Sequence, residues 1–230
     1  MENKTSSSVK TRRIAVMAML AAISFAVLLL AHLVPFFSFI PALPFLKYDP
    51  KDVIIAMGGF LLGPLEALAI SVVVSLIEML TISTTGPIGL LMNVLSTAAF
   101  ACTAAVVYRK KHDMGGAILG LALGVVCMTV VMLLWNWLIT PLYMHVPRAV
   151  IVTYMLPGFL PFNLVKAAAN MALTLLLYKP ISKALRNAHL LPPSGGSGRG
   201  KFSAGLSIFS VVLLISCILV ALALLGLLGG

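Results

Sequence analysis

A lysine flanked by two asparagines is the part of this sequence with the clearest chemical potential. Asn163, Lys166 and Asn170 lie within the apolar segment 158–178, at spacings of three and four residues. Such spacings place the three side chains on one face of a helix. An ionisable side chain at the centre of a bilayer costs about 3 kcal/mol or more, so it normally marks a transport pathway or a ligand site. The alternative is that Lys166 extends to the lipid headgroups and binds nothing.

The composition assigns the chain to the membrane proteins. Hydrophobic residues make up 61% of the 230 residues and charged residues only 10%, against about 25% charged residues in a typical soluble domain. The apolar runs are too many for one soluble core and lack the alternation of barrel strands. We therefore predict an all-α polytopic membrane protein. Its three cysteines lie in apolar segments without metal-ligand spacing, which indicates packing roles: Cys102, Cys127 and Cys217.

The apolar runs predict a six-helix membrane core and one additional helix. A tail at 1–13 precedes the core at 14–186, whose expected spans are 14–34, 53–62, 65–80, 88–108, 115–139 and 158–178. Several are shorter than the roughly 20 residues of a full crossing, so we expect tilted or partly re-entrant helices. A linker at 187–201 contains the run PPSGGSGRG, which is typical of flexible chains. The final segment, 202–230, holds a seventh span at 202–228, and we expect the linker to decouple it from the core. The alternative is that this span packs on the bundle and is needed for stability or partner contact.

Basic residues determine the predicted orientation. With the N-terminus in the cytoplasm, twelve lysines and arginines lie inside and only Lys47, Lys51 and Arg148 outside, as the positive-inside rule requires. The inside set is Lys4, Lys10, Arg12, Arg13, Arg109, Lys110, Lys111, Lys179, Lys183, Arg186, Arg199 and Lys201. The net charge of +10 is therefore mostly topological, and nucleic acid is not an expected partner.

On this topology the polar residues of four expected helices share one depth. Asn163 and Lys166 lie about 8–12 Å inward from the outer end of their span, by the rise of an α-helix. Asn93, Asn136 and Glu78 fall in the same outer layer. This convergence predicts a ligand cavity that opens outward. The alternative for each asparagine is a hydrogen bond between helices.

Two motifs carry a family resemblance. The motif PFLKYDPKD at 44–52 precedes a glycine-rich short span that ends in Gly-Pro, and PFNLVKAAAN occupies 161–170. Together they resemble the first loop and the last core helix of riboflavin-specific substrate-binding subunits, the S components, of energy-coupling factor (ECF) transporters. Asn136 falls where that family is expected to carry an amide. The resemblance covers about residues 13–186 and leaves the seventh span as an addition.

The resemblance implies a function and a site in a bacterial cell membrane. Riboflavin would be bound as transported ligand, with no cofactor. Its flat ring and polyhydroxylated tail need apolar walls and fixed polar partners, because an unmatched buried polar atom costs about 1–3 kcal/mol. The implied partners are Asn93, Asn136, Asn163 and Lys166, and the implied lid is Phe45, Leu46 and Tyr48, with Lys47 and Asp49 beside it. From the residues alone, the loop could instead rest on the headgroups, as could Phe36, Phe37 and Phe39, and Asp49 and Asp52 with Lys47 and Lys51 are interpreted as a solvated charge cluster.

The first expected span carries a stripe of small residues. Ala18, Ala22 and Ala26 recur every four residues, which lets another helix approach closely. Generic helix packing is one interpretation. In the resembling family this face docks on a transmembrane coupling subunit, which works with two ATP-binding subunits.

Catalytic motifs are absent from the sequence. The six acids form no paired set inside the expected bundle, and no HExxH, GxSxG or Walker motif occurs. We therefore predict that the chain is not an enzyme. Two function classes remain: a substrate-capture subunit that works with a separate ATPase module, and an autonomous ion-coupled permease. A proton-coupled permease is expected to bury a carboxylate near the midplane, whereas Glu66 and Glu78 are expected near the two membrane surfaces.

Overall fold

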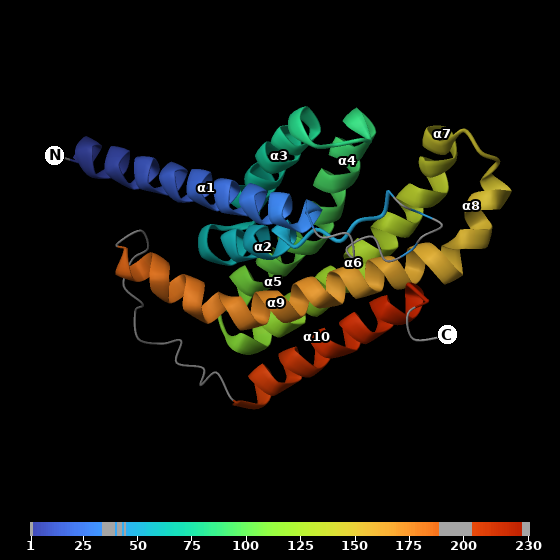
Figure 1. Ribbon diagram of the computed structural model, residues 1–230. Helices are drawn as coiled ribbons and strands as arrows, with labels where there is room; N and C mark the ends of the chain where they lie inside the picture. The colour runs from blue at the N-terminus through green and yellow to red at the C-terminus, as the bar shows by residue number, and fades with distance from the viewer. Residues whose placement is uncertain (1, 34–39, 41–42, 44, 189–203, 227–230) are drawn as a thin grey trace.

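The computed structural model describes residues 2–33, 40, 43, 45–188 and 204–226, and every regular element within these ranges is helical (Figure 1). The α-helices are α1 (Glu2–His32), α2 (Lys51–Leu62), α3 (Pro64–Thr81), α4 (Gly86–Thr97), α5 (Thr103–Lys110), α6 (Met114–Leu138), α7 (Thr140–Met144), α8 (Arg148–Tyr154), α9 (Leu160–Asn187) and α10 (Ala204–Leu224). Two π-helical turns, η2 (Ala98–Cys102) and η3 (Met155–Phe159), join α4 to α5 and α8 to α9. The predicted roles of Phe36, Phe37, Phe39, Arg199, Lys201 and the linker from residue 189 lie outside the described residues, as do the side chains of Lys4 and Arg186.

Six helical stretches in the described part of the chain are long and apolar enough to cross a membrane. They are Lys10–His32, Pro64–Thr81, Gly86–Lys110, Met114–Leu138, Arg148–Ala184 and Gly205–Leu224. The expected second span is not among them, because the 12 residues of α2 extend only about 18 Å and a bilayer core is about 30 Å thick. The predicted tail at 1–13 also differs, since α1 begins at Glu2 and continues through it.

A tight turn reverses the chain between α2 and α3. Gly63 has a φ of 129°, a conformation that glycine adopts without steric cost. Pro64 takes the first position of α3, where its missing N–H is not needed. Arg13 of α1 donates a hydrogen bond to the Leu62 carbonyl at 2.8 Å and pairs with Glu66 at 2.5 Å. These two contacts link α1 to the end of α2 and the start of α3.

The bundle near this turn, called here the apolar half, has a close-packed core. Its buried residues include Leu20, Met57, Ile70, Phe100 and Leu121. A Cβ atom at Gly120 would lie 2.6 Å from the Ala104 carbonyl oxygen, and one at Gly124 would lie 2.7 Å from the Phe100 carbonyl oxygen. The backbones of α5 and η2 therefore approach α6 directly, at a separation that only glycine permits.

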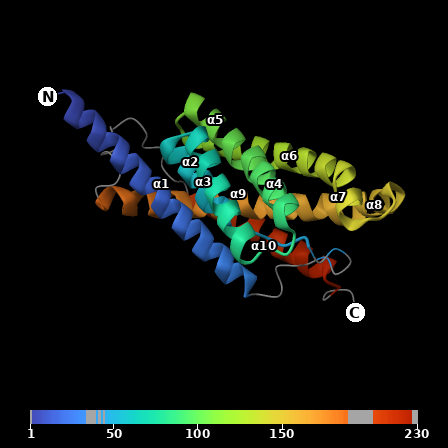
Figure 2. The same ribbon diagram turned by 90° about the horizontal axis from the view of Figure 1, so that it is seen from above.

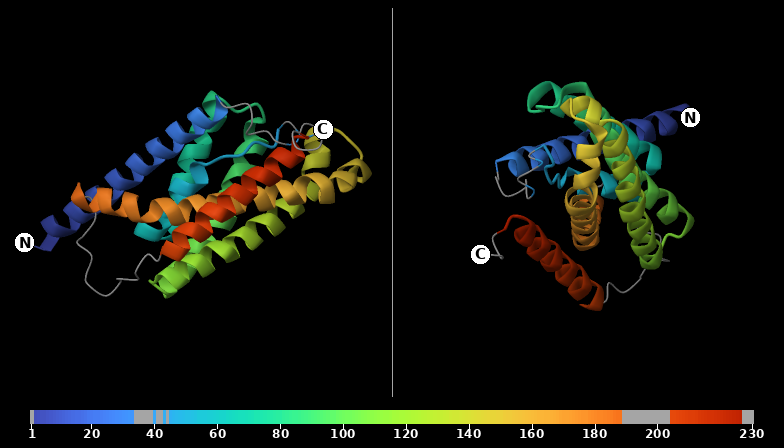
Figure 3. Two further views of the ribbon diagram at one scale, coloured as in Figure 1. Left: turned by 60° about the horizontal axis from the view of Figure 1, so that its bottom comes forward. Right: turned by 90° about the vertical axis from the view of Figure 1, so that its right-hand side faces the viewer.

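The last helix packs on the core instead of lying apart from it. α10 packs against α9, on the side away from α3 and α4 (Figures 1 and 3). Helices α3 and α4 are neighbours of each other (Figure 2). Cys217 of α10 is buried in a second apolar cluster with Leu43 and Leu46 of the loop before α2 and Val165 of α9. The expectation that α10 is decoupled from the core is therefore wrong. The composition of the linker predicts only that the connection between α9 and α10 is flexible. Whether α10 packs on the core is determined by the apolar surface of α10 itself.

Candidate ligand-binding cavity

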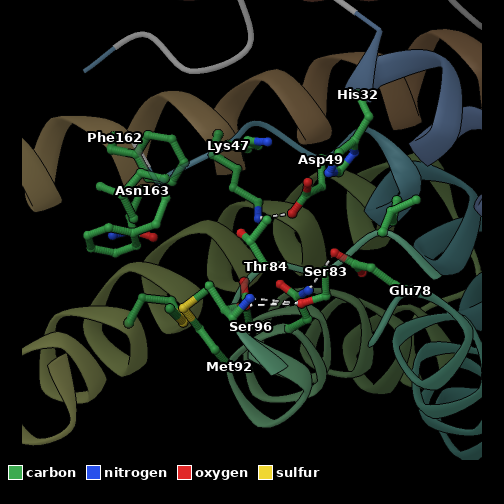
Figure 4. A pocket seen from close by; sticks show the side chains of 17 residues that line it. His32, Lys47, Asp49, Glu78, Ser83, Thr84, Met92, Ser96, Phe162 and Asn163 are labelled. Carbon is green, nitrogen blue, oxygen red and sulfur yellow. Dashed lines mark hydrogen bonds and ion pairs between the residues drawn. The ribbon is translucent and has the colours of Figure 1, made fainter. Parts of the chain in front are cut away.

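An open cavity of about 660 Å³, including the space at its mouth, lies at the end of the bundle away from the Gly63 turn. The loop before α2, the end of α1, the α3–α4 turn, α4, α6 and α9 surround it. Figure 4 shows Phe162 and Asn163 on one side and His32, Asp49 and Glu78 on the other. The lining residues are His32, Phe45, Leu46, Lys47, Asp49, Glu78, Ile82, Ser83, Thr84, Thr85, Met92, Asn93, Ser96, Met132, Phe162, Asn163 and Lys166.

The polar stripe of α9 faces this cavity and the bundle interior. Asn163 and Lys166 line the cavity, while Asn170 is fully buried one turn deeper. Lys166 is only 6% exposed and its Nζ donates to Asp49 Oδ2 at 2.9 Å. Lys166 therefore does not extend to the headgroups, and its role in binding a ligand stays a prediction.

A second buried lysine joins the first through shared carboxylates. Lys51 of α2 donates to Glu78 of α3, and its Nζ lies 4.0 Å from Asp49 Oδ2. Asn93 of α4 donates to the other Glu78 oxygen at 2.9 Å. Two lysines thus hold Asp49 and Glu78 between four segments of the chain.

Asp52 extends these contacts deeper into the bundle. Its carboxylate accepts hydrogen bonds from Thr97 Oγ1 at 2.6 Å and from Asn170 Nδ2 at 3.4 Å. The Tyr48 hydroxyl donates to Asn170 Oδ1 at 2.8 Å. The whole set, called here the buried polar network, comprises Tyr48, Asp49, Lys51, Asp52, Glu78, Asn93, Thr97, Lys166 and Asn170.

The loop residues of this network have strongly altered acidities. Burial alone would raise the pKa of Asp49, but the adjacent charges of Lys166 and Lys51 outweigh it and hold that pKa below its usual value. Burial, together with the charges of Asp52 and Asp49, raises the pKa of Tyr48 far above its usual value. Asp49 is therefore a stable anion at neutral pH, and Tyr48 keeps the proton that it donates to Asn170.

The family of the chain follows from its sequence match over these same elements. The family model described as "ECF transporter, substrate-specific component" matches residues 12–178, a range that contains the loop, the cavity and the buried polar network. This chain belongs to that family. It is accordingly an S component of the ECF transporters, a membrane transport protein and not an enzyme, and the predicted all-α polytopic fold is confirmed.

Individual relatives match the S component over almost their full length. The riboflavin transporter FmnP of Bacillus subtilis (strain 168) is 28% identical over 194 residues, with 79% of this chain and 99% of the relative covered. The riboflavin transporter RibU of Staphylococcus aureus (strain TCH60) is 27% identical, with 77% and 94% covered. A solved structure described as the S component of a bacterial ECF transporter shares 29% identity at a TM-score of 0.63, with 77% of this chain and 99% of that chain covered.

The S component's cavity is lined by seven of the nine residues that the sequence nominated for the ligand site: Phe45, Leu46, Lys47, Asp49, Asn93, Asn163 and Lys166. Tyr48 lies outside the lining and bonds to Asn170. Asn136 does not reach the cavity either, because it is fully buried and its amide is used locally. It donates to the Met132 carbonyl at 2.7 Å and accepts from Thr140 at 2.9 Å, so it stabilises the α6–α7 junction.

The loop charges are buried, which corrects their interpretation as a solvated cluster. Asp49 is 6% exposed, Lys51 1% and Asp52 0%, and only Lys47 is exposed among the four. The expectation that no acids meet inside the bundle is also wrong, since Asp49 and Glu78 share Lys51. Local sequence shows opposite charges side by side, but their partners Glu78 and Lys166 are distant in the chain.

Several residues that line the cavity of the S component were not predicted from the sequence. The α3–α4 turn contributes Ser83, Thr84 and Thr85, and apolar segments contribute Met92 and Phe162. Short hydroxyl side chains in a turn and methionines in a span are common in membrane helices, so neither gives a signal. Phe162 was detectable, because it directly precedes Asn163 in the PFNLVK motif.

The alanine stripe of the S component is exposed. Ala18, Ala22 and Ala26 lie on the outer side of α1, whereas Leu20 and Leu28 of the same helix are buried toward the bundle. Within the described part of the chain the stripe therefore serves no packing inside this molecule.

Proposed function

We propose that this S component binds riboflavin in the cavity from the outer side of a bacterial membrane and delivers it with a separate ATP-driven coupling module. The observation that carries the proposal is the meeting of Asn163 and Lys166 of α9 with Phe45 and Asp49 of the loop around one cavity. The names of the FmnP and RibU relatives support riboflavin as the ligand. Membership of the ECF family supports this function over an autonomous permease.

The cavity chemistry suits an uncharged amphipathic ligand. Phe45, Phe162 and Met92 offer apolar surface for a flat ring. The amides of Asn93 and Asn163 each donate one N–H within the protein, to Glu78 and to the Phe159 carbonyl, and each keeps a second N–H and an oxygen for polar edges. The two buried lysines near them, Lys51 and Lys166, are already paired with carboxylates. Such a site favours a neutral ring with hydroxyl groups, because a ligand charge would have to compete with ion pairs that are already formed.

The proposed outward opening rests on charge distribution. Arg13 and the Arg109–Lys110 pair lie at the Gly63-turn end of the bundle, and the cavity lies at the other end, bounded by His32 and the α3–α4 turn. The positive-inside rule assigns the Gly63-turn end to the cytoplasm. The cavity then opens toward the exterior.

A direct experiment tests the ligand. The protein is purified from cells grown with riboflavin, examined for yellow absorbance, and, after removal of bound flavin, titrated with riboflavin by fluorescence quenching. Saturable quenching with one flavin per chain is expected. Absence of both co-purified flavin and quenching would contradict riboflavin as the ligand, even though the family assignment would stand.

A second experiment tests coupling at the exposed stripe. Ala22→Trp should leave riboflavin binding unchanged, because Ala22 lies on the outer side of α1, but should impair assembly with the coupling module, since a small-residue face admits no large side chain at a close helix contact. Ile23→Trp, at the next position of the same helix, which is 41% exposed and about 100° away from Ala22 in direction, is the control. Normal co-purification and uptake with Ala22→Trp would show that the stripe is not the docking face.

A further inference from the structure

α10 lies beyond the part of the chain that the family shares. The family match ends at residue 178, and the related S-component structure is 99% covered by 77% of this chain. α10 begins at Ala204. It is therefore an addition to the matched core, and its contacts are added contacts.

One face of α10 is committed to the core. Leu213, Leu214, Cys217, Ala221 and Leu224 recur at helical spacing and pack into the second apolar cluster. Residues between them, such as Ile215 and Leu219, are each 51% exposed. This division indicates a docked helix with a lipid-facing side, and the small side chains of Cys217 and Ala221 allow close approach to α9.

The opposite side of that cluster reaches the cavity. Leu46 of the loop and Phe162 of α9 belong to the cluster that contains Cys217, and both also line the cavity. These two side chains therefore belong both to the apolar cluster that α10 completes and to the wall of the space proposed for the ligand. A displacement of α10 would remove packing from behind two walls of the site.

α10 also bears on the orientation of α9. Phe162, Val165 and Ala169 belong to the cluster with α10, and each immediately precedes a residue of the polar stripe, Asn163, Lys166 or Asn170. Neighbouring helix positions differ by about 100° in direction, so contacts on one face fix where the other points. The left view of Figure 3 shows α10 crossing α9 obliquely on one side of the bundle.

We propose that α10 is a brace, which holds the loop around Leu46 and the polar face of α9 against bound ligand and slows ligand release. This inference rests on riboflavin binding in the cavity as proposed above. Its physical basis is that loop opening and α9 rotation must both disrupt the cluster around Cys217. Cys217 is thus a positioning residue, and it touches no ligand.

Release kinetics in the full-length protein test the brace. Cys217→Phe places a large side chain in the buried contact, and Ile218→Phe places the same side chain at the next position, which is 50% exposed. Riboflavin dissociation is measured by fluorescence recovery after a chase. Cys217→Phe should accelerate dissociation by about tenfold, the equivalent of roughly 1.4 kcal/mol, while Ile218→Phe and the conservative Cys217→Ala should stay within about twofold, as expected for surface or volume-compatible changes. Equal rates in Cys217→Phe and Ile218→Phe would overturn the brace.

Thiol labelling gives a second test that needs no large substitution. Cys102 and Cys127 are replaced by alanine, which leaves Cys217 as the single thiol, and its reaction with N-ethylmaleimide is followed with and without riboflavin. Bound riboflavin should slow the labelling, and Ile218→Cys in a Cys217→Ala background should show no such dependence. Labelling of Cys217 that ignores riboflavin would refute the brace in a protein that binds the flavin. A full-length chain that binds no riboflavin would instead refute the proposed function, and the brace with it.

Discussion

The two halves of the bundle are stabilised by different kinds of contact. In the apolar half, α5 and η2 pack on α6 at Gly120 and Gly124, where a single added carbon would meet backbone atoms. In the other half, the buried polar network links a loop and four helices through ion pairs and hydrogen bonds around an open cavity. Close packing has essentially one arrangement, whereas polar side chains can exchange partners when a ligand enters. The comparison indicates that the apolar half gives the bundle a fixed structure, whereas the half with the buried polar network contains the side chains that can respond to a ligand.

The largest expected effect comes from removing the nearer carboxylate partner of a buried lysine. Glu78→Leu leaves Lys51, which is 1% exposed, with only Asp49 Oδ2 at 4.0 Å as a carboxylate partner, and should lower the free energy of unfolding by about 3 kcal/mol. The double variant Lys51→Met/Glu78→Leu should recover most of that loss, because no charge remains unpaired. Chemical unfolding in detergent measures both. A double variant as unstable as the single one would show that the pair is not what stabilises this half.

A smaller loss of stability is expected from overpacking the apolar half. Gly120→Ala forces a Cβ atom to 2.6 Å from the Ala104 carbonyl oxygen and should cost about 1–3 kcal/mol of unfolding free energy. Gly115→Ala in the same helix is the matched control, since its Cβ would lie no closer than 3.4 Å to another atom. The riboflavin affinity of the folded protein should be equal in both variants. A large change in affinity with Gly120→Ala would mean that the two halves are not independent.

Substitutions of two asparagines distinguish an effect on riboflavin binding from an effect on the stability of the fold. Asn163 lines the cavity and Asn136 does not, although both donate to a backbone carbonyl four residues earlier. Asn163→Leu should weaken riboflavin binding by about 1–3 kcal/mol, while Asn136→Leu should leave the affinity unchanged and reduce stability alone. Fluorescence titration and unfolding of the same preparations decide. Equal affinities in the two variants would remove Asn163 from the site.

The smallest expected effect is a dependence of stability on pH. In the folded state the pKa of Asp49 is lower than its ordinary value. The resulting stabilisation is fully present at pH values above the ordinary carboxyl pKa of about 3.9, and it is lost as the pH falls through the folded-state pKa. The stability difference between the natural protein and Asp49→Asn should thus be constant from about pH 8 to pH 5 and shrink below about pH 4. A difference that already changes near pH 6 would assign the titration to another group.

The sequence predicted the elements of this fold better than their contacts. Apolar runs located α3, the α4–α5 stretch and α6 to within two residues, because length and hydrophobicity determine membrane crossing, whereas α1 begins at Glu2 and α9 ends at Asn187, well outside the expected spans. The residues of α9 were nominated as a candidate site for a similar reason: a lysine in an apolar helix is costly and needs a partner. The partner itself, Asp49, lies 117 residues away, and no local pattern connects the two.

Two failures have a common physical origin. Lys51 and Asp52 were interpreted as solvated because they adjoin an interfacial loop, yet helix α2 carries them into the bundle. Asn136 was assigned to the site from its depth and from the family resemblance, although its direction around α6 points its amide to Met132 and Thr140. Depth follows from residue number, whereas direction and burial depend on how helices pack, which a single sequence does not contain.

The π-helical turn η2 has a consequence for which insertions and deletions this chain can accept. A π turn closes through i→i+5 hydrogen bonds and takes in an extra residue, so it changes the helical phase between α4 and α5. On the α4 side, Thr97 points to Asp52; on the α5 side, Ala104 presents its backbone to Gly120. Straightening 98–102 into a regular α-helix with the same number of residues would turn one side by about 100° relative to the other, and either the Thr97–Asp52 contact or the glycine contact would then be lost. Deleting one residue from 98–102 would instead remove the π turn and keep the phase, so this segment accepts a one-residue deletion better than a one-residue insertion.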